Sequence, residues 1–155
     1  SIPHDHPSLR EQASRAKAGA ALAENLSVMI CVGETLAQRD AGQAEDVVGA
    51  QLAGSVPEDV DAAQLMIAYE PVWAIGTGKV ASEADIGAMH AHIHTQLAQR
   101  GLGDVPILYG GSVKPGNAGA IFAVAYVDGA LVGGASLSAE SFLGIVVGAS
   151  EAEEA

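Results

Sequence analysis

The chain is poor in cysteine, in positive charge and in aromatic side chains. Among its 155 residues there is one cysteine, Cys31, which excludes an intrachain disulfide and fits a reducing compartment. Lys and Arg together number 7 against 19 Asp and Glu, so the formal net charge is -12. We expect this surface to bind neither nucleic acid nor anionic membranes, because both need clustered cations.

Long apolar runs are also missing. No run reaches the roughly 18 residues of a membrane-spanning helix, and residues 1–7 lack the basic and apolar regions of a signal peptide. We therefore expect a cytoplasmic protein. Hydrophobic residues make up 49% of the chain and aromatic residues 4%, with a mean hydropathy of +0.26. There is ample material for a core, and it must be built from Ala, Val, Leu and Ile.

Strand-like and helix-like segments alternate along the chain. Four apolar runs show no polar alternation, which predicts strands buried on both faces, at residues 28–32, 65–69, 106–109 and 130–132. Helices are predicted at residues 11–24, 44–53, 82–100, 117–123 and 139–147. In the clearest one, Ser82 and Asp85 form a capping box and Gly101 ends the helix.

This alternation predicts a parallel sheet with helices outside it, an α/β fold. We expect a single domain over residues 1–155, with an irregular N-terminal segment at 1–10 and a solvated acidic tail at 150–155.

One predicted strand ends in a single carboxylate. Glu70 follows the run 65–69 and is followed at once by Pro71 and a loop with two glycines, Gly76 and Gly78. Catalytic groups of α/β barrels lie at the carboxyl ends of strands, and a loop of this kind can close over a ligand. The local pattern leaves two interpretations open: a catalytic base, or a strand-end glutamate in a salt bridge.

Glycine pairs follow two other predicted strands. Gly110-Gly111-Ser112 and Gly133-Gly134 let backbone N–H groups approach an anion without a Cβ in the way. The chain has three lysines, at 17, 79 and 114, so we expect an anion to be held by backbone dipoles. A tight turn is the alternative for each pair alone. No P-loop sequence occurs.

Two histidines tempt a metal interpretation. His90 and His94 lie one helical turn apart, a spacing that zinc sites use, yet Ala91 stands where a zincin has glutamate. The ligand count is too low for a defined site, so we expect no metal and histidines at the surface.

The run 68–79 resembles, residue for residue, the signature of the triosephosphate isomerase family, and residues 31–36, 109–113 and 131–136 match further family segments. The resemblance implies an α/β fold, a (β/α)8 TIM barrel of which this chain is about the second half, roughly four βα units. It implies an isomerase of glycolysis and gluconeogenesis that interconverts dihydroxyacetone phosphate and D-glyceraldehyde 3-phosphate through an enediolate. The family needs no cofactor and is homodimeric.

The resemblance also implies site residues. Glu70 matches the family's catalytic base, and the phosphate contacts carry over to Gly76, Ser112, Gly133 and Gly134. Leu131 and Ile75 cover the carboxylate when the lid closes. The lid matches Pro71, Val72, Trp73, Ala74, Ile75, Gly76, Thr77, Gly78 and Lys79.

Three neighbouring residues receive supporting roles. Cys31 is expected as a buried neighbour of Glu70, and Glu34 as a structural acceptor of hydrogen bonds near the loops. His94 stands where the family usually has an arginine that pairs with an aspartate, here Asp128. A histidine there would make the pairing weaker and dependent on pH.

Some family motifs have no counterpart. The asparagine and lysine after the family's first strand are missing, as is the Gly-His-Ser-Glu-Arg stretch with its electrophilic histidine. Two interpretations stay open. The chain is part of a triosephosphate isomerase, or it is a catalytically incomplete half-barrel that binds phosphate or pairs with a complementary half.

Overall fold

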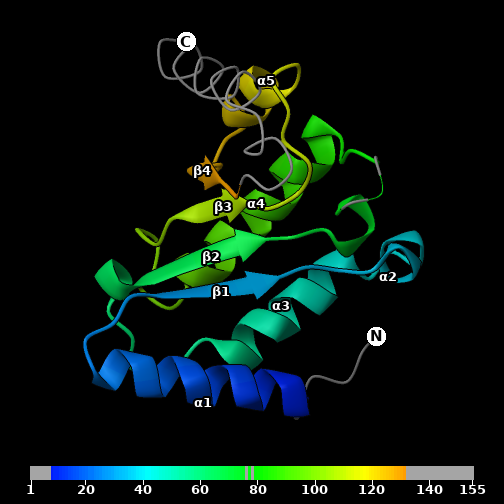
Figure 1. The fold of residues 1–155 in the computed structure, drawn as a ribbon. Helices are drawn as coiled ribbons and strands as arrows, with labels where there is room; N and C mark the ends of the chain where they lie inside the picture. Colours follow the sequence, from blue (N-terminus) through cyan, green and yellow to red (C-terminus); the bar gives the residue numbers. More distant parts are fainter. Residues whose placement is uncertain (1–7, 76, 78, 132–155) are drawn as a thin grey trace.

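The computed structural model describes residues 8–75, 77 and 79–131. Four parallel strands form one sheet in the order β1-β2-β3-β4 (Figure 1). The strands are β1 (Val28–Val32), β2 (Leu65–Tyr69), β3 (Ile107–Tyr109) and β4 (Gly129–Ala130). The predicted parallel sheet of four strands is confirmed. The last strand begins one residue earlier than expected, and its predicted final residue, Val132, lies outside the described residues.

Three longer helices accompany the strands: α1 (Leu9–Ala23), α3 (Ala44–Ser55) and α4 (Glu83–Ala98). Shorter ones are α2 (Leu36–Asp40) and α5 (Ala118–Phe122), with 3-10 turns η1 (Ala62–Gln64) and η2 (Val72–Ala74). Figure 1 shows α3 and α4 behind the sheet and α1 alongside β1. The helix expected at 139–147 and the acidic tail at 150–155 lie outside the described residues.

Capping residues set two helix starts. Ser8 and Glu11 form a full capping box, so α1 begins at Leu9, two residues before the prediction and inside the segment expected to be irregular. Of the two bonds of the capping box expected for α4, one forms: Ser82 Oγ accepts the N–H of Asp85 at 3.0 Å. The Asp85 carboxylate accepts instead from Arg39, at 3.3 Å.

The core lies between the sheet and the helices. Ile30 and Val32 of β1, Ile67 of β2 and Ile107 of β3 are buried beside apolar residues of α3 and α4. Along β1 burial alternates, because Met29 is 42% exposed and Cys31 is exposed. The prediction that this strand is buried on both faces is therefore wrong. The described helices cover one of its faces, as side chains alternate across a strand.

The carboxyl ends of the strands are aligned. Val32, Tyr69, Tyr109 and Ala130 stand side by side in register. Hydrogen bonds continue one residue further: Glu70 N–H donates to Val32 at 2.7 Å, Gly110 N–H to Tyr69 at 2.7 Å, and Leu131 N–H to Tyr109 at 2.9 Å. The loops that follow β1, β2 and β3 thus start at one edge of the sheet. Among the described residues, no helix is long and apolar enough to cross a membrane.

Candidate functional site

Glu70 is held between two glycines. A Cβ on Gly33 would fall 1.7 Å from the backbone oxygen of Glu70, and one on Gly110 would fall 2.5 Å from its Cγ. No side chain larger than hydrogen fits at either position without displacing Glu70. The carboxylate is half-buried, and its backbone is bonded to β1. The neighbouring strand ends therefore fix the place of this side chain.

A cleft of about 180 Å³ opens beside Glu70, lined by Cys31, Val72 and the first turns of α1. Cys31 is a neighbour of Glu70, as expected, but it is exposed, so its predicted burial is wrong. Its side chain lies on the face of β1 that the described helices leave open. Partial desolvation, then the charge of Glu70 and a hydrogen bond to it, raise the pKa of the Cys31 thiol.

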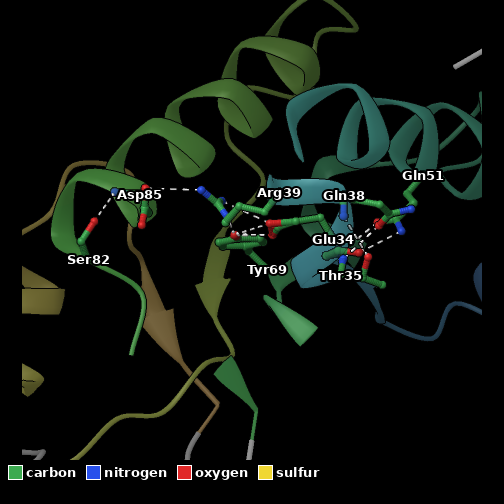
Figure 2. Close-up of polar contacts among 9 residues, drawn as sticks. Glu34, Thr35, Gln38, Arg39, Gln51, Tyr69, Ser82 and Asp85 are labelled. Carbon is green, nitrogen blue, oxygen red and sulfur yellow. Dashed lines mark hydrogen bonds and ion pairs between the residues drawn. The ribbon is translucent and has the colours of Figure 1, made fainter. Parts of the chain in front are cut away.

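Glu34 is a fully buried carboxylate beneath the loops (Figure 2). It accepts the Tyr69 hydroxyl at 2.6 Å and the Arg39 guanidinium at 3.2 Å. The structural role expected of Glu34 is borne out by these bonds. Burial and the adjoining carboxylate raise the pKa of Tyr69. A buried charge needs such partners, because desolvation without them is costly.

Arg39 contacts Glu34, Asp85 and Trp73, and Figure 2 shows the first two of these contacts. Besides Glu34 it binds the Asp85 carboxylate at the start of α4, at 3.3 Å. Its guanidinium carbon also lies 5.3 Å from the ring centroid of Trp73 in η2, within the range of a cation–π contact. The turn that begins the expected lid is thereby linked to α2 and α4.

Hydrogen bonds to backbone groups hold the described part of the lid segment. Val72 N–H donates to the Glu34 carbonyl at 3.1 Å. Ser112 Oγ donates to the Ala74 carbonyl at 3.0 Å, so the loop after β3 is bonded to the lid segment. Thr77 Oγ1 donates to the Trp73 carbonyl at 2.8 Å and accepts from Lys79 N–H at 3.2 Å.

The expected phosphate loops are only partly described. Of their residues Ser112 is placed, beside the lid segment, while Gly76, Gly133 and Gly134 lie outside the described residues, as does Gly78 of the lid. A Cβ on Gly111 would fall 2.0 Å from Tyr109 Oη, so this glycine lies directly over the tyrosine. Burial, aided by the charge of Glu34, raises the pKa of Tyr109 to about 12.

The prediction that the histidines of α4 lie at the surface is wrong for His90. This residue is fully buried, with Nδ1 2.9 Å from the Tyr126 carbonyl oxygen. His94 stacks on the Tyr126 ring at 4.2 Å. The expected partner, Asp128, uses its carboxylate to accept the backbone N–H of Ile107 at 2.8 Å. Among the described residues no His94–Asp128 ion pair forms, and the His94 imidazole packs on the Tyr126 ring instead.

Several supporting residues escaped the sequence interpretation. Gln51 of α3 bonds both the N–H and the carbonyl of Gly33, at 2.8 and 3.0 Å. Arg39 and Tyr69 were missed as partners of Glu34. The signal for Arg39 existed: Glu34 was expected to accept hydrogen bonds, and Arg39, five residues on, is one of the few cationic donors in the sequence. Gln51 gave no comparable signal.

The comparisons with known proteins agree with this geometry. The parallel βα arrangement is similar to that of a crystal structure of triosephosphate isomerase from Bartonella henselae, with a TM-score of 0.81 and 43% identity over 89% of this chain and 57% of that one. This arrangement places the chain in the class of α/β-barrel proteins. In that class the carboxyl ends of the strands, where Glu70 lies, carry the active site.

Sequence matches narrow the class to one family. The family model described as triosephosphate isomerase matches residues 8–149. The triosephosphate isomerase of Jannaschia sp. (strain CCS1) is 53% identical over 96% of this chain and 60% of the relative. That of Ruegeria pomeroyi is 58% identical over 84% and 53%. The chain belongs to the triosephosphate isomerase family, and it spans little more than half the length of these relatives.

Proposed function

We propose that the chain supplies the base and lid of a triosephosphate isomerase, which interconverts dihydroxyacetone phosphate and D-glyceraldehyde 3-phosphate. The observation that carries this proposal is the placement of Glu70 at a strand end, held between Gly33 and Gly110 beside a cleft. A base that moves a proton between adjacent carbons must be held this precisely.

In the proposed reaction Glu70 removes a proton from the carbon beside the substrate carbonyl. The electron pair of that C–H bond forms the C=C bond of the enediolate while the carbonyl electrons move onto oxygen. The carboxylic acid returns the proton to the former carbonyl carbon, and the hydroxyl proton passes from one oxygen to the other, so that the new carbonyl forms. Triosephosphate isomerase is itself the standard example of a glutamate base in such a reaction. The open side of the Glu70 cleft leaves room for the carbon that is deprotonated.

Phosphate binding is proposed for Ser112, Gly76, Gly133 and Gly134. Support comes from the loop after β3, which starts at the same sheet edge as Glu70 and contacts the lid segment through Ser112 and Ala74. Leu131 also follows this edge, bonded to Tyr109. The nine residues of the lid, 71–79, are proposed to close over the substrate and exclude water, which would strengthen the base.

The remaining groups of a complete site are expected in the part of the relatives that this chain does not match. Enediolate oxygens need a hydrogen-bond donor and a nearby positive charge. We therefore expect negligible isomerase activity from the 155-residue chain by itself. A cytoplasmic location and a homodimeric complete protein also remain expectations from the family.

A second candidate function is pairing of this half-barrel with a complementary half. The exposed side chains of Met29 and Cys31 on β1 favour it, because an apolar sheet face open to water is normally covered. In this alternative the chain binds phosphate or pairs with its complement, without turning over substrate.

One assay separates the two. The purified chain is assayed in both directions with and without a polypeptide that carries the unmatched N-terminal portion of the Jannaschia sp. relative. The first proposal predicts turnover in the mixture that Glu70→Gln abolishes. Binding of the two polypeptides without turnover would support the second candidate instead. Robust turnover by the chain alone, abolished by Glu70→Asp, contradicts the expectation that it is incomplete.

A further inference from the structure

His90 lies under three segments of the candidate site. Its ring is 5.8 Å from that of Tyr69, edge to face, and 6.3 Å from that of Tyr109. These tyrosines immediately precede Glu70 and Gly110. Its Nδ1 lies 2.9 Å from the carbonyl oxygen of Tyr126, in the connection between α5 and β4. A single side chain of α4 thus contacts β2, β3 and the segment that leads into β4.

The hydrogen bond fixes the state of the ring. A carbonyl oxygen can only accept, so Nδ1 must carry the hydrogen and donate it. His90 is 0% exposed, and its Nε2 is buried with no hydrogen-bond partner among the described residues. A second hydrogen on Nε2 would place a charge among aromatic rings. The uncharged ring with hydrogen on Nδ1 is therefore the form that the packing accommodates.

Tyr126, whose carbonyl accepts the His90 hydrogen bond, has an unfavourable backbone conformation. Its φ is +64°, a left-handed conformation that costs free energy in a residue with a side chain and that its surroundings must hold. His90 bonds its carbonyl, and His94, one turn further along α4, stacks on its ring at 4.2 Å. Two residues on, Asp128 binds the N–H of Ile107, which continues the same connection onto β3.

We propose that His90 is a positioning residue whose neutral Nδ1–H imidazole ties the α5–β4 connection to the carboxyl ends of β2 and β3. It holds Tyr69 and Tyr109, and through them the starts of the Glu70 and Gly110 loops. This role goes beyond the proposed isomerisation, and its test needs no catalysis.

The pH dependence follows from the groups around the ring. Desolvation lowers the pKa of His90, while the bond to Tyr126 and the charge of Asp128 oppose that shift. Tyr69 faces the ring from β2, its hydroxyl bonded to Glu34, and Tyr109 faces it from β3. The folded form binds this proton less readily than the unfolded chain. The stabilisation is complete above the usual histidine pKa of about 6.5 and declines as the pH falls below it.

The test uses the whole 155-residue chain labelled uniformly with 15N. Long-range 1H–15N correlation spectra at neutral pH should show the Nδ1–H tautomer for His90, assigned by its loss in His90→Asn. Amide signals of residues 110–112 should titrate together with the His90 ring, with a midpoint below about 6.5. An Nε2–H tautomer, an imidazolium at neutral pH, or loop amides that ignore the His90 titration would overturn the proposal.

Two variants separate the effect of the His90 ring from that of its hydrogen bond, and a third serves as the control. His90→Phe keeps a ring but no donor, and it should shift the amides of both 126–128 and 110–112. His90→Asn keeps a donor near the position of Nδ1 and should restore 126–128 but not the titration. His92→Phe is the matched control, because His92 bonds the Glu45 carbonyl at 3.0 Å and touches α3 instead. It should leave 110–112 unchanged; a loop shift as large as that of His90→Phe would contradict a specific role.

Discussion

At the scale of single residues, the site is defined by what is small around Glu70. Gly33 and Gly110 leave the space that its backbone oxygen and Cγ occupy. Neither glycine needs a left-handed backbone, so their role is steric, unlike Gly101, whose φ is +72°. The adjoining strand ends therefore fix the position of the Glu70 side chain and add no charge next to it.

Gly33→Ala should therefore lower the free energy of unfolding. The new methyl group would overlap a backbone oxygen at 1.7 Å, and overpacking of this kind costs about 1–3 kcal/mol or more. Urea denaturation measures the change. Gly19→Ala in α1 is the matched control, since nothing lies within 4 Å of its added Cβ. It should stabilise the chain by up to about 1 kcal/mol. Equal effects of the two substitutions would contradict the steric account.

Buried tyrosines give a second prediction, at alkaline pH. The pKa of Tyr109 is raised to about 12, and that of Tyr69 is raised as well. Their folded values exceed the unfolded value of about 10, so the stabilisation is complete below about pH 10 and is lost as the pH rises toward about 12. The free energy of unfolding should fall over this range, and less steeply in Tyr109→Phe. Identical slopes for the two proteins would refute the assignment.

At the scale of elements, Arg39 connects α2, the start of α4 and the first turn of the lid segment. The buried end of this network is Glu34, and its exposed end is Asp85, whose side chain is 41% exposed. The energetic weight should lie at the buried end, because solvent screens the outer pair.

Arg39→Met should destabilise the fold by about 3–5 kcal/mol, because it leaves the buried Glu34 charge without its cation. Asp85→Asn should cost less than about 1 kcal/mol. Chemical denaturation of both variants measures this contrast. In the double variant Glu34→Gln, Arg39→Met the loss should be smaller than in Arg39→Met alone. A double variant that is less stable than the single one would disprove the role assigned to the buried charge.

The sequence predicted the positions of the strands and helices better than the burial of their side chains. The apolar runs predicted the strands because parallel strands covered by helices need such runs, and Ser82 correctly predicted the start of α4. Local pattern could not tell that β1 has one open face, since Met29 and Cys31 are as apolar as their buried neighbours. The burial of His90 was also unpredictable, because it depends on Tyr126, 36 residues away.

At the scale of the whole molecule, the four strands bring one set of loops to a shared edge. Glu70 and the first residues of the proposed lid lie there, and Ser112 joins the two loops. The chain matches 60% of the Jannaschia sp. relative and 53% of the Ruegeria pomeroyi one. A complete barrel needs about eight strands, so the proposed base is tested best with the rest of a barrel present.

The most direct test of the central claim is a chimera. Residues 8–149 of this chain replace the matching portion of the Jannaschia sp. triosephosphate isomerase, and the interconversion of the two triose phosphates is measured. We predict an active, folded chimera whose kcat falls about 10²–10⁴-fold on Glu70→Gln, the range attributed to a positioned general base. A folded chimera without activity, or one that keeps its rate after Glu70→Gln, would contradict the assignment of Glu70 as the base.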